Sequence, residues 1–130
     1  DGRVDASRLD YIHASKTGAL IRMAARMGAI CSGAEADDLI HITVYGEKAG
    51  LAFQIADDLL DEISSTQDLG KTAGKDRKQN KATYPAFYGI EASRRKALDL
   101  AKEASEALKP YGERAQRLCD LAYYLAERTS

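Results

Sequence analysis

Proline is scarce in this chain, and that scarcity constrains the fold more than any other feature of the sequence. Pro85 and Pro110 are the only two prolines among 130 residues, while alanine, leucine, glutamate, lysine and arginine dominate. Proline interrupts helices, whereas the abundant residues favour them, so long stretches of this chain can form helix. The sequence therefore predicts an all-α fold with long helices.

Turn and capping signals divide the chain into five expected helices. Ser7 or Asp5 can cap the first helix and Gly33 can end it, and the acidic residues within 35–38 suit the first turn of the second. The second helix also carries Gly46 and Gly50, which cost helix stability and indicate that something packs or binds close to its backbone. We expect helices at about residues 8–32, 36–62, 83–89, 91–109 and 113–128.

Residues 63–82 break the helical pattern and predict a mobile basic loop. Glycine and serine recur there, and five basic residues against two acidic ones leave a charge of +3. A long loop inside a compact chain is more often functional than accidental. We expect residues 1–130 to belong to one helical domain that contains this loop.

Charge and composition exclude several classes of function. The 19 basic and 20 acidic residues nearly balance, whereas proteins that bind nucleic acid carry a basic excess. Charged residues interrupt every apolar stretch before it could span a membrane, and no signal peptide is visible.

Cys31 and Cys119 lack metal-ligand spacing and are expected to be buried, reduced thiols in a cytoplasmic protein. His13 and His41 have no partner spacing for zinc or a triad, so we interpret both as structural.

An apolar stripe runs along the first expected helix. Leu20, Met23 and Met27 recur at helical spacing, so they share one face. Such stripes usually pack into a core, although this one could also line part of a binding pocket.

The sharpest motif is the run from Gln54 to Asp61 in the second expected helix. At about 100° per residue, Gln54, Asp57, Asp58 and Asp61 share a helix face roughly 100° wide. Carboxylates this close repel one another, and Mg²⁺ relieves the repulsion by binding their oxygens, commonly together with a substrate phosphate. The motif predicts a magnesium site at the three aspartates. A solvated acidic helix end is the alternative interpretation.

Basic residues in two other segments could meet a metal-bound polyphosphate. Lys16 stands at the head of the apolar stripe beside the Thr17 hydroxyl, and Lys71 and Lys81 lie in the basic loop. In a site of this kind the metal takes the inner phosphate oxygens and lysines take the outer ones. A snorkelling surface lysine and a solvated loop are the alternatives for these two segments.

Several of these motifs, in order and at matching spacing, resemble the trans-isoprenyl diphosphate synthases, especially the short-chain farnesyl and geranylgeranyl diphosphate synthases. The resemblance covers essentially the whole chain and corresponds to the C-terminal half of those enzymes. The segments that carry it are residues 16–20, 45–52, 53–61, 69–76, 81–85 and 121–128.

The resemblance implies an antiparallel helical bundle of the isoprenoid synthase type, usually a homodimer, with the active site inside each bundle. In the implied reaction, Mg²⁺ helps an allylic diphosphate to ionise. The double bond of isopentenyl diphosphate attacks the allylic cation, and loss of a proton completes the elongation. The implied function is a magnesium-dependent prenyltransferase of isoprenoid biosynthesis.

The resemblance also implies roles for individual residues. Asp57 and Asp61 match metal contacts of the family's second aspartate-rich motif, with Asp58 supporting them. Thr17 and Gln54 would place oxygen dipoles near the developing cation. Phe53 would border the isopentenyl site. The lysines that match those holding the allylic diphosphate and the departing pyrophosphate are Lys16, Lys71 and Lys81.

One departure from the family is large. The first aspartate-rich motif, which binds two more magnesium ions, is absent, as are the arginines that follow it. We therefore expect these 130 residues to be inactive alone and to need the N-terminal half of the same enzyme.

Two other functions remain as alternatives. A class I terpene cyclase ionises the same substrates, but its second metal motif normally mixes Asn, Ser or Thr with Glu, and three aspartates disfavour it. A non-catalytic helical subunit would explain the absent first motif, whereas the lysines and Gln54 argue against it.

Overall fold

The computed structural model describes residue 8 and residues 17–67 and 83–128 of the chain. Every regular element within these ranges is a helix, which confirms the predicted all-α class. The elements are α2 (Ala19–Cys31), α3 (Ala36–Gln67), α5 (Tyr84–Tyr88), α6 (Ile90–Ala107), the 3₁₀ helix η4 (Lys109–Ala115) and α7 (Gln116–Glu127).

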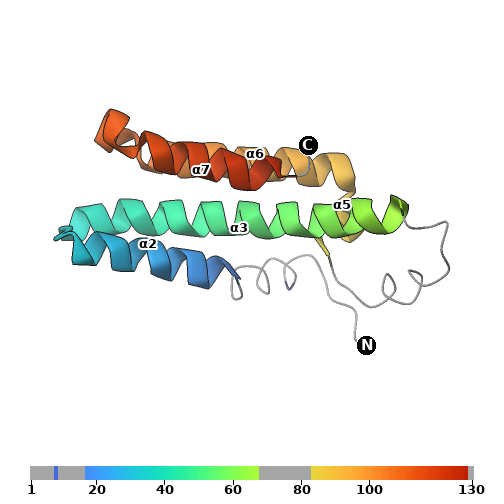
Figure 1. The fold of residues 1–130 in the computed structure, drawn as a ribbon, viewed down its shortest axis with the longest axis horizontal. Helices are drawn as coiled ribbons and strands as arrows, with labels where there is room; N and C mark the ends of the chain where they lie inside the picture. The colour runs from blue at the N-terminus through green and yellow to red at the C-terminus, as the bar shows by residue number, and fades with distance from the viewer. Residues whose placement is uncertain (1–7, 9–16, 68–82, 129–130) are drawn as a thin grey trace.

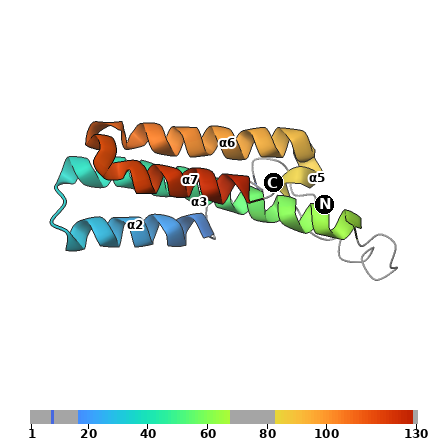
Figure 2. The same cartoon turned by 45° about the horizontal axis from the view of Figure 1, so that its top comes forward.

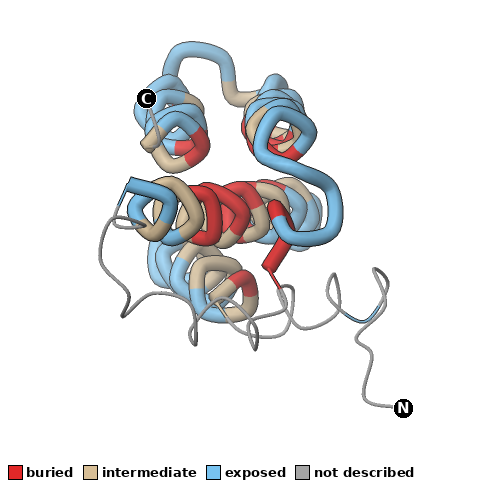
Figure 3. Tube along the Cα trace, turned by 90° about the vertical axis from the view of Figure 1, so that its right-hand side faces the viewer, coloured by how far each residue is buried: buried red, intermediate tan, exposed pale blue. Residues whose placement is uncertain are grey.

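The long helix α3 lies at the centre of the fold (Figure 1). Helix α2 covers one side of it and runs antiparallel to it, while α6 and α7 form a second antiparallel pair on the other side (Figures 1 and 2). Seen end-on, the buried residues concentrate where α3 faces α6 and α7 (Figure 3). The molecule is therefore a three-layer bundle in which α3 contacts every other α-helix.

The start of α3 is fixed by the side chain of Asp38. One carboxylate oxygen accepts a hydrogen bond from the backbone N–H of Glu35 at 3.0 Å, which caps a helix end whose N–H groups lack partners. The other oxygen accepts the Tyr111 hydroxyl at 2.6 Å, and these two bonds lower the pKa of Asp38. Tyr111 also meets the ring of His41 edge-on at 5.9 Å, which supports the structural interpretation of His41. His13 lies outside the described residues.

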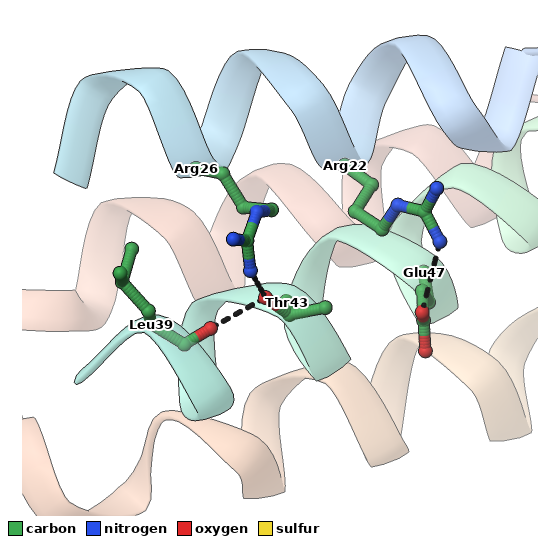
Figure 4. Close-up of polar contacts among 5 residues, drawn as sticks. All are labelled: Arg22, Arg26, Leu39, Thr43 and Glu47. Atoms are coloured by element: carbon green, nitrogen blue, oxygen red, sulfur yellow. Dashed lines mark hydrogen bonds and ion pairs between the residues drawn. The ribbon is translucent and has the colours of Figure 1, made fainter. Parts of the chain in front are cut away.

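Gly46 and Gly50 allow α2 to approach the backbone of α3. A Cβ atom at Gly46 would lie 2.7 Å from the Cα atom of Arg22, and one at Gly50 would lie 2.7 Å from the Cα atom of Gly18. The predicted close approach at these glycines is confirmed, and its cause is helix packing. Polar contacts flank it: Arg22 pairs with Glu47 at 3.2 Å, and the Arg26 guanidinium donates to the Thr43 hydroxyl (Figure 4).

The apolar stripe of α2 does not lie in a core. Leu20, Met23 and Met27 are 66, 58 and 58% exposed, and Ile30 beyond them is 56% exposed. Helix α2 packs on α3 through its opposite side, where glycines permit close backbone contact. The expectation of core packing was therefore wrong for the part of the chain that the structure describes.

Other sequence expectations also need correction. Helix α3 begins at Ala36 as expected but continues to Gln67, so residues 63–67 are helical and do not belong to the predicted loop. Residues 68–82, like 9–16 of the first expected helix, lie outside the described residues. Cys31 is exposed and Cys119 is half-buried, and both are free thiols, so the expectation of burial was wrong.

Helices α5, α6 and α7 fall close to their expected positions. Thr83 caps α5, because its hydroxyl oxygen accepts the N–H of Ala86 at 3.3 Å, and Pro85 sits in the first turn. The connection between α6 and α7 is the 3₁₀ helix η4, in which Gly112 takes a positive φ of 56°. None of the helices described is long and apolar enough to cross a membrane.

Candidate active site

The predicted acidic face lies on the C-terminal half of α3, together with Phe53 and Gln54. Asp57 is half-buried, Asp58 is buried and Asp61 is exposed, so one helix presents three carboxylates in three environments. Thr17 lies in a π-helical segment that leads directly into α2. The three predicted phosphate ligands, Lys16, Lys71 and Lys81, lie outside the described residues.

Asp58 faces the protein and is only 8% exposed. Its carboxylate accepts the backbone N–H of Tyr84 at 3.2 Å. It also accepts a hydrogen bond from the side-chain amide of Gln54, at 3.5 Å and at the long end of the range for such a bond. Asp58 thereby links α3 to the start of α5, a contact between residues 26 positions apart.

Asp57 and Asp61 are the acids that remain accessible on this face. No group of three or more His, Cys, Asp or Glu residues in the described ranges is arranged to hold a metal ion by itself. Magnesium bound through one or two carboxylates and a substrate phosphate does not require such a group. The chemistry of the donors therefore fits Mg²⁺ as a metal shared with a substrate, and the metal assignment stays a prediction.

The start of α2 approaches the acidic half of α3 at Gly18. Gly18 is buried against Gly50, and Gln54 follows Gly50 by one helical turn on the same side of α3. Thr17, which precedes Gly18, therefore lies near the stretch of α3 that carries Gln54. The fold brings these two predicted oxygen dipoles to neighbouring parts of the bundle.

Phe53 has a partner that the sequence did not indicate. The guanidinium of Arg128, just beyond the end of α7, lies over the Phe53 ring at 4.9 Å from its centroid. A cation held over an aromatic face is attracted by the electron density of the ring. One face of Phe53 is therefore occupied by Arg128.

Two hollows lie on the described surface. One, of about 440 Å³, is lined by Leu60, Tyr124, Glu127 and Arg128 between α3 and α7. A second, of about 230 Å³, lies beside α5 and α6. Neither is lined by any of the three aspartates, so neither hollow encloses the predicted metal site.

Sequence reasoning missed two contacts around this site. The Tyr84 backbone was not identified as the partner of Asp58, although the sequence did predict a helix that starts at about residue 83. Arg128 gave no signal, because its contact with Phe53 joins residues far apart in the sequence.

The helical bundle and the aspartate-rich face beside Gln54 agree with the resemblance to the isoprenoid synthases. The polyprenyl synthetase family model matches residues 1–118, and this chain belongs to that family.

Curated relatives agree with this family. The chain is 45% identical over 126 residues to a dimethylallyltranstransferase of Fischerella ambigua (strain UTEX 1903), a match that covers 97% of this chain and 36% of that protein. It is 41% identical over 132 residues to a geranylgeranyl diphosphate synthase of Cyanophora paradoxa, covering 100% of this chain and 44% of that one. It is 42% identical over 129 residues to the farnesyl diphosphate synthase of Escherichia coli (strain K12), covering 96% and 43%.

Solved structures agree on the fold. A protein of Marinomonas sp. MED121 aligns with a TM-score of 0.76 at 31% identity, over 96% of this chain and 41% of that chain. A geranyltransferase of Helicobacter pylori 26695 aligns with a TM-score of 0.69 at 24% identity, over 99% of this chain and 41% of that one. The chain thus spans about two fifths of the length of the relatives it matches.

Proposed function

We propose that this chain is part of a prenyltransferase that condenses an allylic diphosphate with isopentenyl diphosphate to give a longer trans-prenyl diphosphate. The observation that carries the proposal is the aspartate-rich face of α3 next to Gln54, in a chain whose family match covers residues 1–118. Relatives named as farnesyl and geranylgeranyl diphosphate synthases support the substrate class.

Magnesium is the proposed cofactor, with Asp57 and Asp61 as its ligands. Both are carboxylates on one face of α3, and neither is buried. When bound, the metal would neutralise the charge that builds up on the departing pyrophosphate.

The proposed reaction breaks the C1–O bond of the allylic diphosphate and leaves an allylic cation and pyrophosphate. The double bond of isopentenyl diphosphate then forms the new C–C bond, and a proton leaves the adjacent carbon. Thr17 and Gln54 would stabilise the cation through side-chain oxygens, while Phe53 would border the isopentenyl group. The lysines proposed to hold the phosphate oxygens are Lys16, Lys71 and Lys81.

The proposed partner of this chain is the N-terminal half of the same enzyme. Supporting it, the exposed apolar stripe of α2 forms a continuous face, and the relatives are more than twice as long as the matched region. Large contiguous apolar faces usually mark interaction surfaces. We propose that the stripe packs against that half, and that the complete enzyme is a homodimer.

A cytoplasmic location is also proposed, and the two free cysteines support it.

The metal assignment is tested by replacing Asp57 with Ala in the complete enzyme. We expect kcat/KM to fall by at least about 100-fold, because a ligand to the charge-neutralising metal is lost. Asp37→Ala is the matched control, because Asp37 is an exposed acid in the first turn of the same helix. A near-wild-type rate with unchanged Mg²⁺ dependence in Asp57→Ala would refute the assignment.

The reaction class is tested by combining this chain with the N-terminal half, Mg²⁺, geranyl diphosphate and isopentenyl diphosphate. Longer linear prenyl diphosphates are the expected products. A cyclic hydrocarbon with pyrophosphate release would indicate a terpene cyclase instead. Tight binding between the halves without turnover would indicate a non-catalytic subunit.

The role of the stripe is tested in the same mixture with Met27→Glu. A charge on this face should weaken association of the two halves, whereas Leu98→Glu, at an exposed leucine on α6, should leave it intact. Equal binding of both variants would place the interface elsewhere.

A further inference from the structure

Asp58 accepts hydrogen bonds from two groups within the protein. A buried carboxylate is costly unless its oxygens accept hydrogen bonds, and this one accepts from Tyr84 and from Gln54. By contrast, Asp57 and Asp61 on the same helix are more accessible than Asp58. The three acids of the motif therefore differ in how accessible their carboxylates are to a ligand.

The contact with Tyr84 fixes where α5 starts. The first N–H groups of a helix have no acceptor within it and need one from elsewhere. Thr83 supplies an acceptor for Ala86, and Asp58 supplies one for Tyr84 from a different helix. Thr83 and Tyr84 are both 8% exposed, so water has little access to replace the Asp58 carboxylate.

The contact with Gln54 fixes which way its amide points. A carboxylate is an acceptor only, whereas an amide side chain has a donor end and an acceptor end. With its NH₂ group toward Asp58, Gln54 must direct its oxygen the other way, because the reverse orientation would set oxygen against oxygen. The oxygen then points away from Asp58. Because it is the negative end of the amide dipole, it is the end that can face a cation.

We propose that Asp58 is a positioning residue and not a metal ligand: it anchors the start of α5 to α3 and orients the Gln54 amide with its oxygen outward. The anchoring role stands on the contacts alone, whereas the consequence for catalysis rests on the proposed function.

The anchor is tested by hydrogen exchange at the Tyr84 amide in the full-length protein. Asp58→Ala should raise the exchange rate by about 10-fold or more, the equivalent of one charge-assisted hydrogen bond. Asp58→Asn keeps an acceptor oxygen and should stay within about 2-fold of the wild type. Asp120→Ala is the matched control. Gln116 and Asp120 have the same four-residue spacing as Gln54 and Asp58, and the Gln116 amide donates to Asp120 at 2.8 Å, but this pair is exposed on α7. Unchanged exchange at Tyr84 in Asp58→Ala would overturn the anchor.

The amide orientation is tested by kinetics of Asp58→Asn beside Asp57→Asn. An asparagine whose oxygen accepts from Tyr84 turns its NH₂ group toward Gln54, which would reverse the Gln54 amide. We expect kcat to fall by about 10-fold, while the Mg²⁺ concentration for half-maximal rate stays within about 2-fold of the wild type. Asp57→Asn should raise that concentration by at least about 10-fold.

An equal rise in the Mg²⁺ requirement in both variants would overturn the positioning role and make Asp58 a ligand. An unchanged kcat in Asp58→Asn would overturn the orientation of Gln54. Absence of prenyl elongation by the complete wild-type enzyme, with its N-terminal half present, would refute the proposed function, and hydrogen exchange at Tyr84 would still decide the anchor.

Discussion

Replacing Gly46 with alanine should separate two opposing effects of a helical glycine. Alanine is favoured over glycine inside a helix by about 1 kcal/mol, so the substitution would stabilise an isolated α3. In this fold, however, the new Cβ atom would lie 2.7 Å from the Cα atom of Arg22, where ordinary contacts begin at 3.4 Å. The neighbouring atom belongs to the backbone of α2, so no side chain can simply rotate away.

The size of the effect follows from that overlap. The two helices must move apart by about 0.7 Å at this point (3.4 Å less 2.7 Å), and overpacking of this kind costs about 1–3 kcal/mol. After the gain of about 1 kcal/mol from helix propensity, Gly46→Ala should lower the free energy of unfolding by about 0–2 kcal/mol. The movement would also strain the ion pair between Arg22 and Glu47.

Gly28 on α2 provides the matched control. A Cβ atom there would meet nothing within 4 Å, so Gly28→Ala keeps the gain in propensity without the clash. We expect it to raise the free energy of unfolding by up to about 1 kcal/mol. Urea denaturation followed by circular dichroism would measure the free energy of unfolding of both variants. The difference between the two values gives the cost of overpacking at Gly46. If Gly46→Ala stabilised the protein as much as Gly28→Ala, the packing of α2 on α3 described above would be wrong.

Two further predictions concern tyrosines that join distant helices. The Tyr45 hydroxyl donates to the backbone oxygen of Leu118 at 2.8 Å, so Tyr45→Phe should lower the free energy of unfolding by about 1 kcal/mol in urea denaturation. Burial raises the pKa of Tyr45 to about 12 from 10.0, so the folded state favours the neutral phenol. That stability is complete below pH 10 and is lost as the pH rises toward 12, a decline that Tyr45→Phe should flatten. Tyr111→Phe removes the bond that lowers the pKa of Asp38 below 3.8. Its destabilisation, measured at neutral pH, should therefore shrink as the pH falls below 3.8, where Asp38 in the wild type becomes protonated.

Helix starts were predictable because their signals are local. The acids in the first turn of α3 and the proline in the first turn of α5 act within a few residues of the helix end. The end of α3 was missed, because Ser65 and Thr66 are typical of loops. Here their hydroxyls donate back to the Glu62 backbone oxygen at 3.0 and 2.8 Å, and the helix continues to Gln67.

The surroundings of each helix face could not be predicted in the same way. Periodicity placed Leu20 and Met27 on one apolar face, but it does not tell which part of a protein covers that face. Similarly, the helical wheel placed Asp58 beside Asp57 and Asp61, whereas its burial depends on Tyr84, 26 residues further along the chain. Local spacing shows which residues share a helix face, whereas the tertiary fold decides which other segments contact that face.

Small side chains dominate the buried core, and this changes how its mutants should be chosen. Among the described residues, eight of the fourteen members of the core cluster are alanines. Helices in contact through alanine can bring their axes close together, so backbone and Cβ atoms make many of the contacts. Among the described core positions, alanine scanning would find only six with a larger side chain to remove, which are Tyr45, Ile55, Leu59, Tyr84, Leu100 and Leu108. Substitution of core alanines by valine or leucine is the more sensitive way to map where these helices touch.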